Sequence, residues 1–213
     1  MTGNFPTIDG ERLWQTLEAS REIGKFGDNG LCRLALSQED KEMRDLFIAW
    51  AEAAGCTVTV DAIGNIFARR PGSDDSLDPV VIGSHLDTQI RGGKYDGILG
   101  VLSGLEVIRT LNDRDIPTRW PLEVAVWTNE EGGRFNPPMM GASAFAGVND
   151  LNDIFDAVDK DGVSVRTALE TTGYLGEAPV GGRAFAAYFE LHIEKGPILD
   201  DEAMDIGIVT GDY

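Results

Sequence analysis

Two short apolar runs on either side of a helical segment constrain the fold of this chain more than any other feature. Val80–Ile82 and Leu122–Trp127 have the pattern of strands that are buried on both faces. Between them, Ile98–Leu111 has the composition of a helix. A strand, a helix and a second strand in this order are typical of a βαβ unit in a sheet covered by helices. The sequence therefore predicts an α/β fold.

The segments before this unit predict a helix and a hairpin. Ser37 followed by Asp40 resembles a capping box, and apolar residues then recur at helical spacing until Gly55 ends the run. The runs 57–60 and 65–68 are short and β-prone around a Gly-Asn turn, which predicts a hairpin at the edge of the sheet.

Composition and charge exclude some classes of partner. The formal net charge of −18 argues against nucleic acid and against an anionic membrane surface, because both attract Lys and Arg. The longest apolar runs fall far short of the roughly 20 residues that a membrane span requires. Cys32 and Cys56 lack metal or redox spacing, and the first residues lack a leader pattern, so we expect a reducing cytoplasm.

The first residues that can do chemistry follow the first buried run. His85 lies at its carboxyl end, Asp87 comes two residues later, and a glycine-rich loop leads to Asp96. Ligand sites of α/β sheets favour this edge. A metal-bound imidazole commonly donates its second N–H to a carboxylate, which is a role open to Asp87. Glycines in the loop allow Asp96 to return toward His85 as a bridge between metals.

Two adjacent carboxylates follow the second buried run. Glu130 and Glu131 stand before a pair of glycines at the carboxyl end of the predicted strand. In a hydrolytic metal site one such group can bind metal while the other accepts a proton from water. We expect Glu131 to bind and Glu130 to act as general base.

The other histidine of the chain lies near its end. Residues 189–194 alternate apolar and polar side chains, which predicts a strand with His192 on the same face as Glu190 and Glu194. Singly, each of these features has a simpler interpretation, a structural histidine or a solvated pair of acids. Their recurrence at successive strand ends favours a metal site. The chain has no GxSxG, Walker A or GxGxxG motif, so serine-hydrolase, P-loop and Rossmann functions lack their defining residues.

Three segments carry a family resemblance: GSHLDTQIRGGKYDGILGVLSGLEV (83–107), TNEEGGRFNPPMMGASAFAG (128–147) and ELHIEKGPILD (190–200). They resemble the amidase/hydantoinase/carbamoylase branch of the two-metal zinc peptidase superfamily, which includes N-carbamoyl-L-amino acid hydrolases, β-ureidopropionases and allantoate amidohydrolases. The resemblance implies a three-layer α/β/α catalytic domain. It also implies that residues 1–213 are the N-terminal portion of that domain, because members are about twice this long.

The resemblance implies two divalent metal ions, with zinc expected and manganese, cobalt or nickel as alternatives. One ion would take His85, Asp96 and His192. Asp96 would bridge to the second ion, which Glu131 would also bind. In the family a third histidine reaches this second ion from a segment that returns after a lid and dimerisation domain, and both histidines of this chain are already assigned.

The remaining roles concern catalysis and substrate. Glu130 would be the general base and Asp87 would orient His85. Lys195 and Arg134 would contact the substrate. Lys195 is a departure, because the family usually has Gln after the HIE triplet, and a lysine has no acceptor.

We therefore expect a metal-dependent hydrolase of linear amide C–N bonds that acts on N-carbamoyl-L-amino acids or 3-ureidopropionate, as part of a homodimeric parent enzyme, with this chain alone inactive. The alternatives are an allantoate amidohydrolase, and a peptidase or acyl-amino-acid deacylase of the same superfamily. A metal-binding or interaction module without turnover is a third possibility.

Overall fold

A five-stranded mixed sheet forms the centre of the computed structural model, which describes residues 6–211. Its strands lie in the order β3-β4-β6-β5-β7. β5 runs parallel to β6 and to β7, whereas β4 runs antiparallel to β3 and to β6. The bounds are β3 Thr57–Val60, β4 Ile66–Arg70, β5 Val80–His85, β6 Leu122–Trp127 and β7 Ala187–Phe189, with a separate hairpin of β1 Lys25–Phe26 and β2 Gly30–Leu31.

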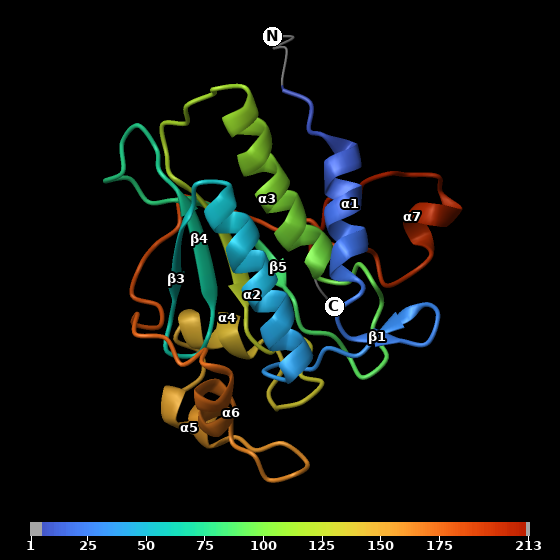
Figure 1. Ribbon diagram of the computed structural model, residues 1–213, viewed down its shortest axis with the longest axis vertical. Coiled ribbons are helices and arrows are strands. Elements are labelled where there is room, and N and C mark those ends of the chain that lie inside the picture. The colour runs from blue at the N-terminus through green and yellow to red at the C-terminus, as the bar shows by residue number, and fades with distance from the viewer. Residues whose placement is uncertain (1–5, 212–213) are drawn as a thin grey trace.

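Helices cover one face of this sheet. Figure 1 shows α2 and α3 in front of the strands and α1 beside α3. In chain order the helices are α1 Gly10–Ser20, α2 Gln38–Ala53, α3 Ile98–Asp113, α4 Met140–Phe145, α5 Leu151–Asp156, α6 Val165–Thr172 and α7 Ile198–Asp201. None of the helices in the described range is long and apolar enough to cross a membrane.

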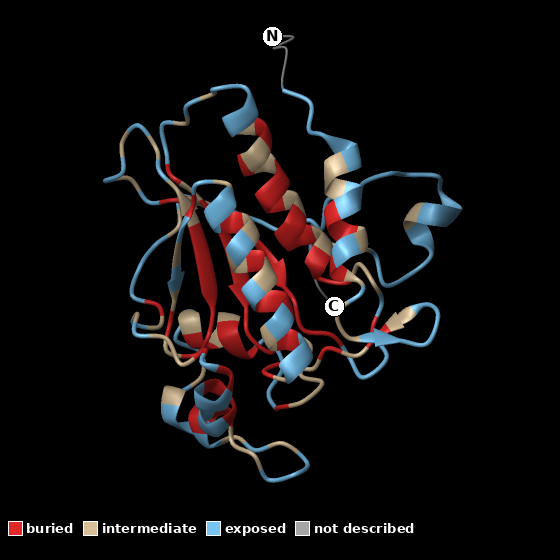
Figure 2. Cartoon of the chain, in the orientation of Figure 1, coloured by how far each residue is buried: buried red, intermediate tan, exposed pale blue. Residues whose placement is uncertain are grey.

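The predicted βαβ unit is confirmed. β5 and β6 are adjacent and parallel, α3 connects them, and His85 pairs in register with Trp127. The buried side of α3 includes Val101, Leu105 and Ile108, which pack into the main core between the helices and the sheet; Figure 2 shows the buried stripe of α3. The α/β class follows directly from these contacts.

The predicted helix and hairpin are also confirmed. The Ser37 side chain accepts a hydrogen bond from the Asp40 N–H (3.2 Å), and α2 ends two residues before Gly55, whose φ of +80° suits glycine. The capping box is only half formed, because the Asp40 carboxylate accepts instead from Leu36 N–H and pairs with the buried Arg44. β3 is the edge strand of the hairpin, as expected.

The predicted strand over residues 189–194 is wrong beyond its first residue. β7 ends at Phe189, where its pairing with Ile82 of β5 stops. The chain then passes over the N-terminal turn of α3, with the Leu191 carbonyl close to Gly100. β7 pairs on one side only among the described strands, so little main-chain bonding holds the segment in the sheet. His192 therefore reaches its position from a loop.

The second face of the sheet carries a smaller aromatic cluster. Phe67 and Trp127 meet edge to face with ring centroids 5.7 Å apart. Phe145 of α4 packs against both rings, and Phe185 stacks on Phe145 at 5.0 Å. This cluster lies next to the carboxyl end of β6, where Glu130 follows.

Candidate metal and catalytic centre

His85 ends β5 fully buried, with a fixed tautomer. Its Nδ1 lies 2.8 Å from the main-chain carbonyl oxygen of Asp87. A carbonyl can only accept, so Nδ1 carries the proton, and Nε2 presents a lone pair when the imidazole is neutral, as it is in a metal ligand. Nε2 has no hydrogen-bond partner in the described part of the chain. A buried lone pair without a donor is what a metal ligand requires.

Asp96 and His192 bring two more ligand atoms to the same place. The Oδ1 atom of Asp96 lies 3.3 Å from Nε2 of His192 and 4.0 Å from Nε2 of His85. The ligand atoms of all three residues lie within 4.8 Å of one another. Oδ1 is buried without a hydrogen-bond partner within residues 6–211. His192 Nδ1 lies 2.9 Å from the Ile193 carbonyl, so the neutral imidazole also presents its Nε2 lone pair.

Three acceptor atoms that face one another repel unless a cation lies between them. Two imidazole nitrogens and one carboxylate oxygen are a donor set that suits zinc and other divalent transition metals. The residues present therefore fit one divalent ion, and we refer to His85, Asp96 and His192 as the histidine site.

Glycine places Asp96 against His85. Gly97 has φ +71° and caps α3, and an added Cβ there would lie 2.5 Å from the His85 Cδ2 and closer still to Cε1 and Nε2. The main chain therefore packs directly on the face of the imidazole. The glycines of this loop predict its turn from the sequence, but they do not predict this contact.

Glu130 and Glu131 point in different directions after β6. Oε2 of Glu130 lies 3.3 Å from Nε2 of His85, and this side chain is 30% exposed. Glu131 is more buried, at 6%, and its Oε2 accepts from Gln89 Nε2 (3.0 Å) and lies 3.2 Å from the Lys195 ammonium. Adjacent acids thus occupy different surroundings, but Glu130 is the one nearer the histidine site.

Asp87 acts on His85 differently from the sequence expectation. Its main-chain carbonyl, and not its carboxylate, holds the imidazole. The carboxylate instead accepts the N–H groups of Glu130 and Glu131, both at 3.2 Å. Burial raises the pKa of Asp87 to about 6 despite these bonds and the nearby His85. Asp87 therefore connects the loop after β5 to the loop after β6.

Arg134 is held by partners in other loops within the described part of the chain, and its expected contact with the substrate stays a prediction. Its guanidinium lies 3.0 Å from Asp159 and donates to the carbonyls of Ala35 (3.1 Å) and Leu36 (2.6 Å). These contacts fasten the loop after β6 to the body of the protein. The sequence could not predict these contacts, because Asp159 and the carbonyls of Ala35 and Leu36 are far from Arg134 in the chain.

Lys195 lies inside the centre. Its Nζ is 3.1 Å from Oδ2 of Asp96 and 3.2 Å from Oε2 of Glu131. Asp96 therefore faces the two histidines with one oxygen and the ammonium with the other.

A cavity of about 540 Å³ adjoins Glu130. Aromatic side chains line much of it, among them Trp127, Phe145, Phe185 and Tyr188. The Tyr188 hydroxyl accepts from Trp127 Nε1 (2.8 Å) and donates to Glu190 (2.9 Å). The cavity could not be predicted from the sequence, because its aromatic rings come from separate segments.

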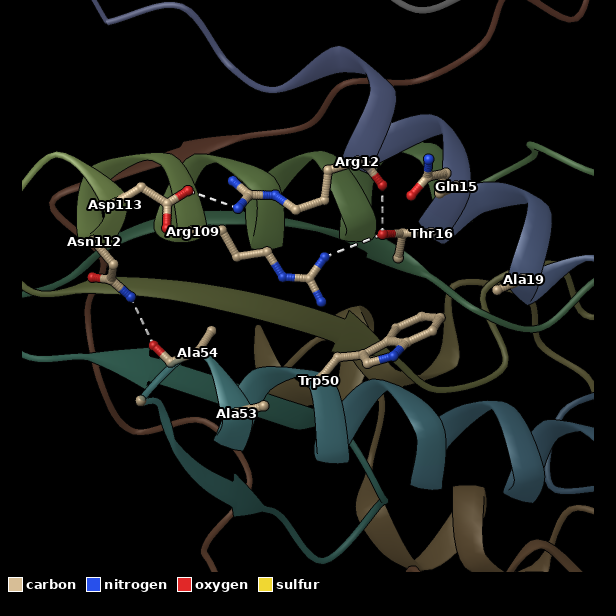
Figure 3. Close-up of a pocket in the computed structure, with 11 residues that line it drawn as sticks. Arg12, Gln15, Thr16, Ala19, Trp50, Ala53, Ala54, Arg109, Asn112 and Asp113 are labelled. Atoms are coloured by element: carbon tan, nitrogen blue, oxygen red, sulfur yellow. Dashed lines mark hydrogen bonds and ion pairs between the residues drawn. The ribbon is translucent and has the colours of Figure 1, made fainter.

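A different pocket lies between α1, α2 and α3 (Figure 3). Arg12 there pairs with Asp113 at 2.6 Å, and Arg109 donates to Thr16 at 3.1 Å. It lies toward the C-terminal end of α3, where Arg109, Asn112 and Asp113 line it, whereas Asp96 precedes the N-terminal end; Ile98 and Arg109 are about 16 Å apart along the helix. This pocket is therefore separate from the candidate centre.

Comparison with known proteins adds three findings. The pattern of Peptidase family M20/M25/M40 matches residues 81–211. N-carbamoyl-L-amino-acid amidohydrolases of Rhizobium meliloti and Geobacillus stearothermophilus are 48% and 39% identical to this chain, over 98% and 96% of it and 50% and 51% of their own lengths. A crystal structure of an amidase of the hydantoinase/carbamoylase family from Burkholderia multivorans is 52% identical, with a TM-score of 0.92, over 93% of this chain and 48% of that one. The chain thus spans about half the length of these proteins.

Proposed function

Because the chain belongs to Peptidase family M20/M25/M40, we propose that it supplies the metal-binding part of an amidohydrolase that cleaves N-carbamoyl-L-amino acids or related ureido acids such as 3-ureidopropionate. The activity, in this proposal, belongs to a longer protein of which residues 1–213 are the N-terminal portion of the catalytic domain. The support is that the amidohydrolase relatives are about twice as long.

One observation carries the metal dependence. One ligand atom each of His85, Asp96 and His192 lies within 4.8 Å of the others, and His85 Nε2 and Asp96 Oδ1 are buried without hydrogen-bond partners in the described range. This arrangement is costly without a cation. We propose zinc as the ion, with manganese, cobalt or nickel able to use the same ligands.

A divalent ion held there would polarise a carbonyl oxygen and make a water molecule more acidic. Glu130 is placed to handle the proton. Its carboxylate is partly exposed and lies 3.3 Å from the His85 nitrogen that faces the site, so it can accept a proton from water and pass it to the departing nitrogen. The main-chain N–H groups of Glu130 and Glu131 both donate hydrogen bonds to the Asp87 carboxylate, and these bonds hold the loop that carries the Glu130 side chain.

The second ion implied by the resemblance does not fit the residues as they lie. It would need Asp96 Oδ2 and Glu131, and the Lys195 ammonium lies within 3.2 Å of both. We therefore assign no step to a second ion.

Two observations support the proposed substrate class: the relatives are N-carbamoyl-L-amino-acid amidohydrolases, and a cavity lies beside Glu130. The cavity of about 540 Å³ is large enough for an amino acid side chain, and its aromatic lining favours an apolar one. A homodimeric parent enzyme and a cytoplasmic location are further parts of the proposal. The two free cysteines agree with a reducing compartment.

The test is a chimera in which this chain replaces the matching half of the Rhizobium meliloti relative. After loading with zinc or manganese, hydrolysis is measured as ammonia release from an N-carbamoyl-L-amino acid, 3-ureidopropionate and allantoate, and as release of free amino acid from an N-acyl amino acid and a dipeptide. We expect turnover of the first two. Preferred cleavage of allantoate would favour an allantoate amidohydrolase. Preferred cleavage of the N-acyl amino acid or the dipeptide would favour a deacylase or peptidase of the same superfamily.

Glu130→Gln in the same chimera separates an enzyme from a binding module. We expect turnover to fall by at least about 100-fold, the usual contribution of a general base, with metal content unchanged. Glu177→Gln, on another part of the chain, is the matched control and should leave both unchanged. Full activity of Glu130→Gln would remove Glu130 from the mechanism, and metal binding without any turnover would favour the non-enzymatic module.

A further inference from the structure

The Lys195 ammonium lies between the second oxygen of Asp96, the one not directed at the imidazoles, and the Glu131 carboxylate. Nζ lies 3.1 Å from Asp96 Oδ2 and 3.2 and 3.4 Å from the two oxygens of Glu131. Asp96 thus has one oxygen directed at two imidazoles and the other directed at an ammonium. A bridging carboxylate in a two-metal site divides its oxygens in the same way, with a metal ion on each side.

We propose that Lys195 takes the place of a second metal ion, and that this chain binds one divalent ion where the resemblance implies two. The inference rests on the assignment of the first ion to the histidine site in the proposed function. It goes beyond that function because it makes a side chain of the protein the second cation.

Geometry makes the ammonium and a second ion mutually exclusive. An ion bound to Asp96 Oδ2 and Glu131 would lie about 2.0–2.2 Å from each oxygen. The ammonium lies about 3 Å from the same two residues, so an ion there would meet Nζ well inside contact distance. The lysine would have to leave before the ion could bind.

Charge balance favours the same arrangement. Asp96, Glu130 and Glu131 bring three negative charges to the centre, and the histidines are neutral when they act as ligands. One divalent ion together with Lys195 supplies three positive charges. Two divalent ions beside Lys195 would supply five. Glu131 is also satisfied without metal, because Gln89 Nε2 donates both to its carboxylate (3.0 Å) and to its main-chain carbonyl (2.9 Å).

The experiment is a metal titration of this chain, which needs no turnover. Zinc is added by equilibrium dialysis and counted per chain by elemental analysis, for the unchanged chain and for Lys195→Gln and Lys195→Glu. Lys160→Gln is the control, because it removes the same charge from an exposed side chain paired with Asp161. Manganese replaces zinc in a second series, because two neighbouring manganese ions give a coupled electron paramagnetic resonance signal.

The unchanged chain and the control should bind one ion. Lys195→Gln should bind a second ion at least about tenfold more tightly than the unchanged chain does, since a positive charge a few ångströms away is removed. Lys195→Glu adds a third carboxylate and should bind it more tightly again, with the coupled manganese signal.

Other outcomes overturn the proposal in distinguishable ways. Two ions in the unchanged chain would show that Lys195 does not exclude the second, while the proposed function would stand. One ion in all four proteins would show that Lys195 is not a substitute for metal. No ion in the unchanged chain would remove the histidine site and the proposed function together.

Discussion

Replacing Gly97 with alanine should destroy the proposed metal site while leaving the rest of the fold in place. The new Cβ would lie 2.5 Å from Cδ2 of His85 and nearer to two other ring atoms. Ordinary contact is about 3.4 Å, so the imidazole must move by about 1 Å. Metal ligands tolerate shifts of about 0.2 Å. The His85 nitrogen would therefore leave the position from which it can bind.

Two magnitudes follow from this displacement. Loss of an outer-shell partner alone lowers metal affinity by about 10–100-fold, so misplacing a ligand itself should lower zinc affinity by at least about 100-fold. The φ of +71° at Gly97 adds backbone strain, which costs about 1–3 kcal/mol of unfolding free energy for a residue with a side chain. Competition with a chromophoric zinc chelator measures the affinity, and urea denaturation without metal measures the stability.

Gly93→Ala is the matched control, in the same loop. Its added Cβ would have no neighbour nearer than Asp96 Cβ at 3.9 Å, so zinc affinity should be unchanged and stability should change by less than about 0.5 kcal/mol. If Gly97→Ala binds zinc as tightly as the unchanged protein, the contact between Gly97 and His85 does not define the site. Equal losses in both variants would point to the flexibility of the loop instead.

Two further predictions concern stability. Burial raises the pKa of Asp61 to about 6, above about 3.9 in the unfolded chain. The contribution of Asp61 to the free energy of unfolding is therefore fully present below pH 4 and is lost as the pH rises through 6. This loss is about 3 kcal/mol. Urea denaturation between pH 4 and pH 7 should therefore show a smaller fall in unfolding free energy for Asp61→Asn than for the unchanged protein. An equal fall in both would contradict the raised pKa of Asp61. Arg44→Met should lower the unfolding free energy by about 3–5 kcal/mol, because it leaves the buried Asp40 carboxylate without its partner at 2.7 Å. Adding Asp40→Asn should recover part of this loss, and no recovery would mean that Arg44 acts through its bond to the Gly64 carbonyl.

The parts of the fold that the sequence predicts are those decided by local pattern. The βαβ unit, the helix after Ser37 and the edge hairpin depend on periodicity and turn residues, and all three are confirmed. The strand through His192 depended on pattern too, but a strand also needs neighbours, and β7 pairs with β5 over three residues only. Alternation of side chains could not reveal that.

For the site, the sequence predicts which residues take part but not which of their atoms make the contacts. The sequence indicated that His85, Asp96 and His192 belong together, and these residues do lie together. It could not indicate which oxygen of Asp87 faces His85, because the turn geometry of the loop decides that. Nor could it show that Arg134 is held by Asp159, or that Lys195 lies between Asp96 and Glu131, since these contacts join distant segments.

The position of His192 on a loop gives a bound ion a mechanical role as a cross-link. Residues 190–195 have no strand pairing, yet His192 lies against Asp96 and near the end of β5. An ion held by His85 and His192 would close a long loop of the chain, and closing long loops stabilises a fold by restricting the unfolded chain. Folding of the carboxyl-terminal segment and binding of metal would then be one coupled equilibrium. The supply of free metal in the surroundings, as well as the sequence, would set how much of this segment is held in place.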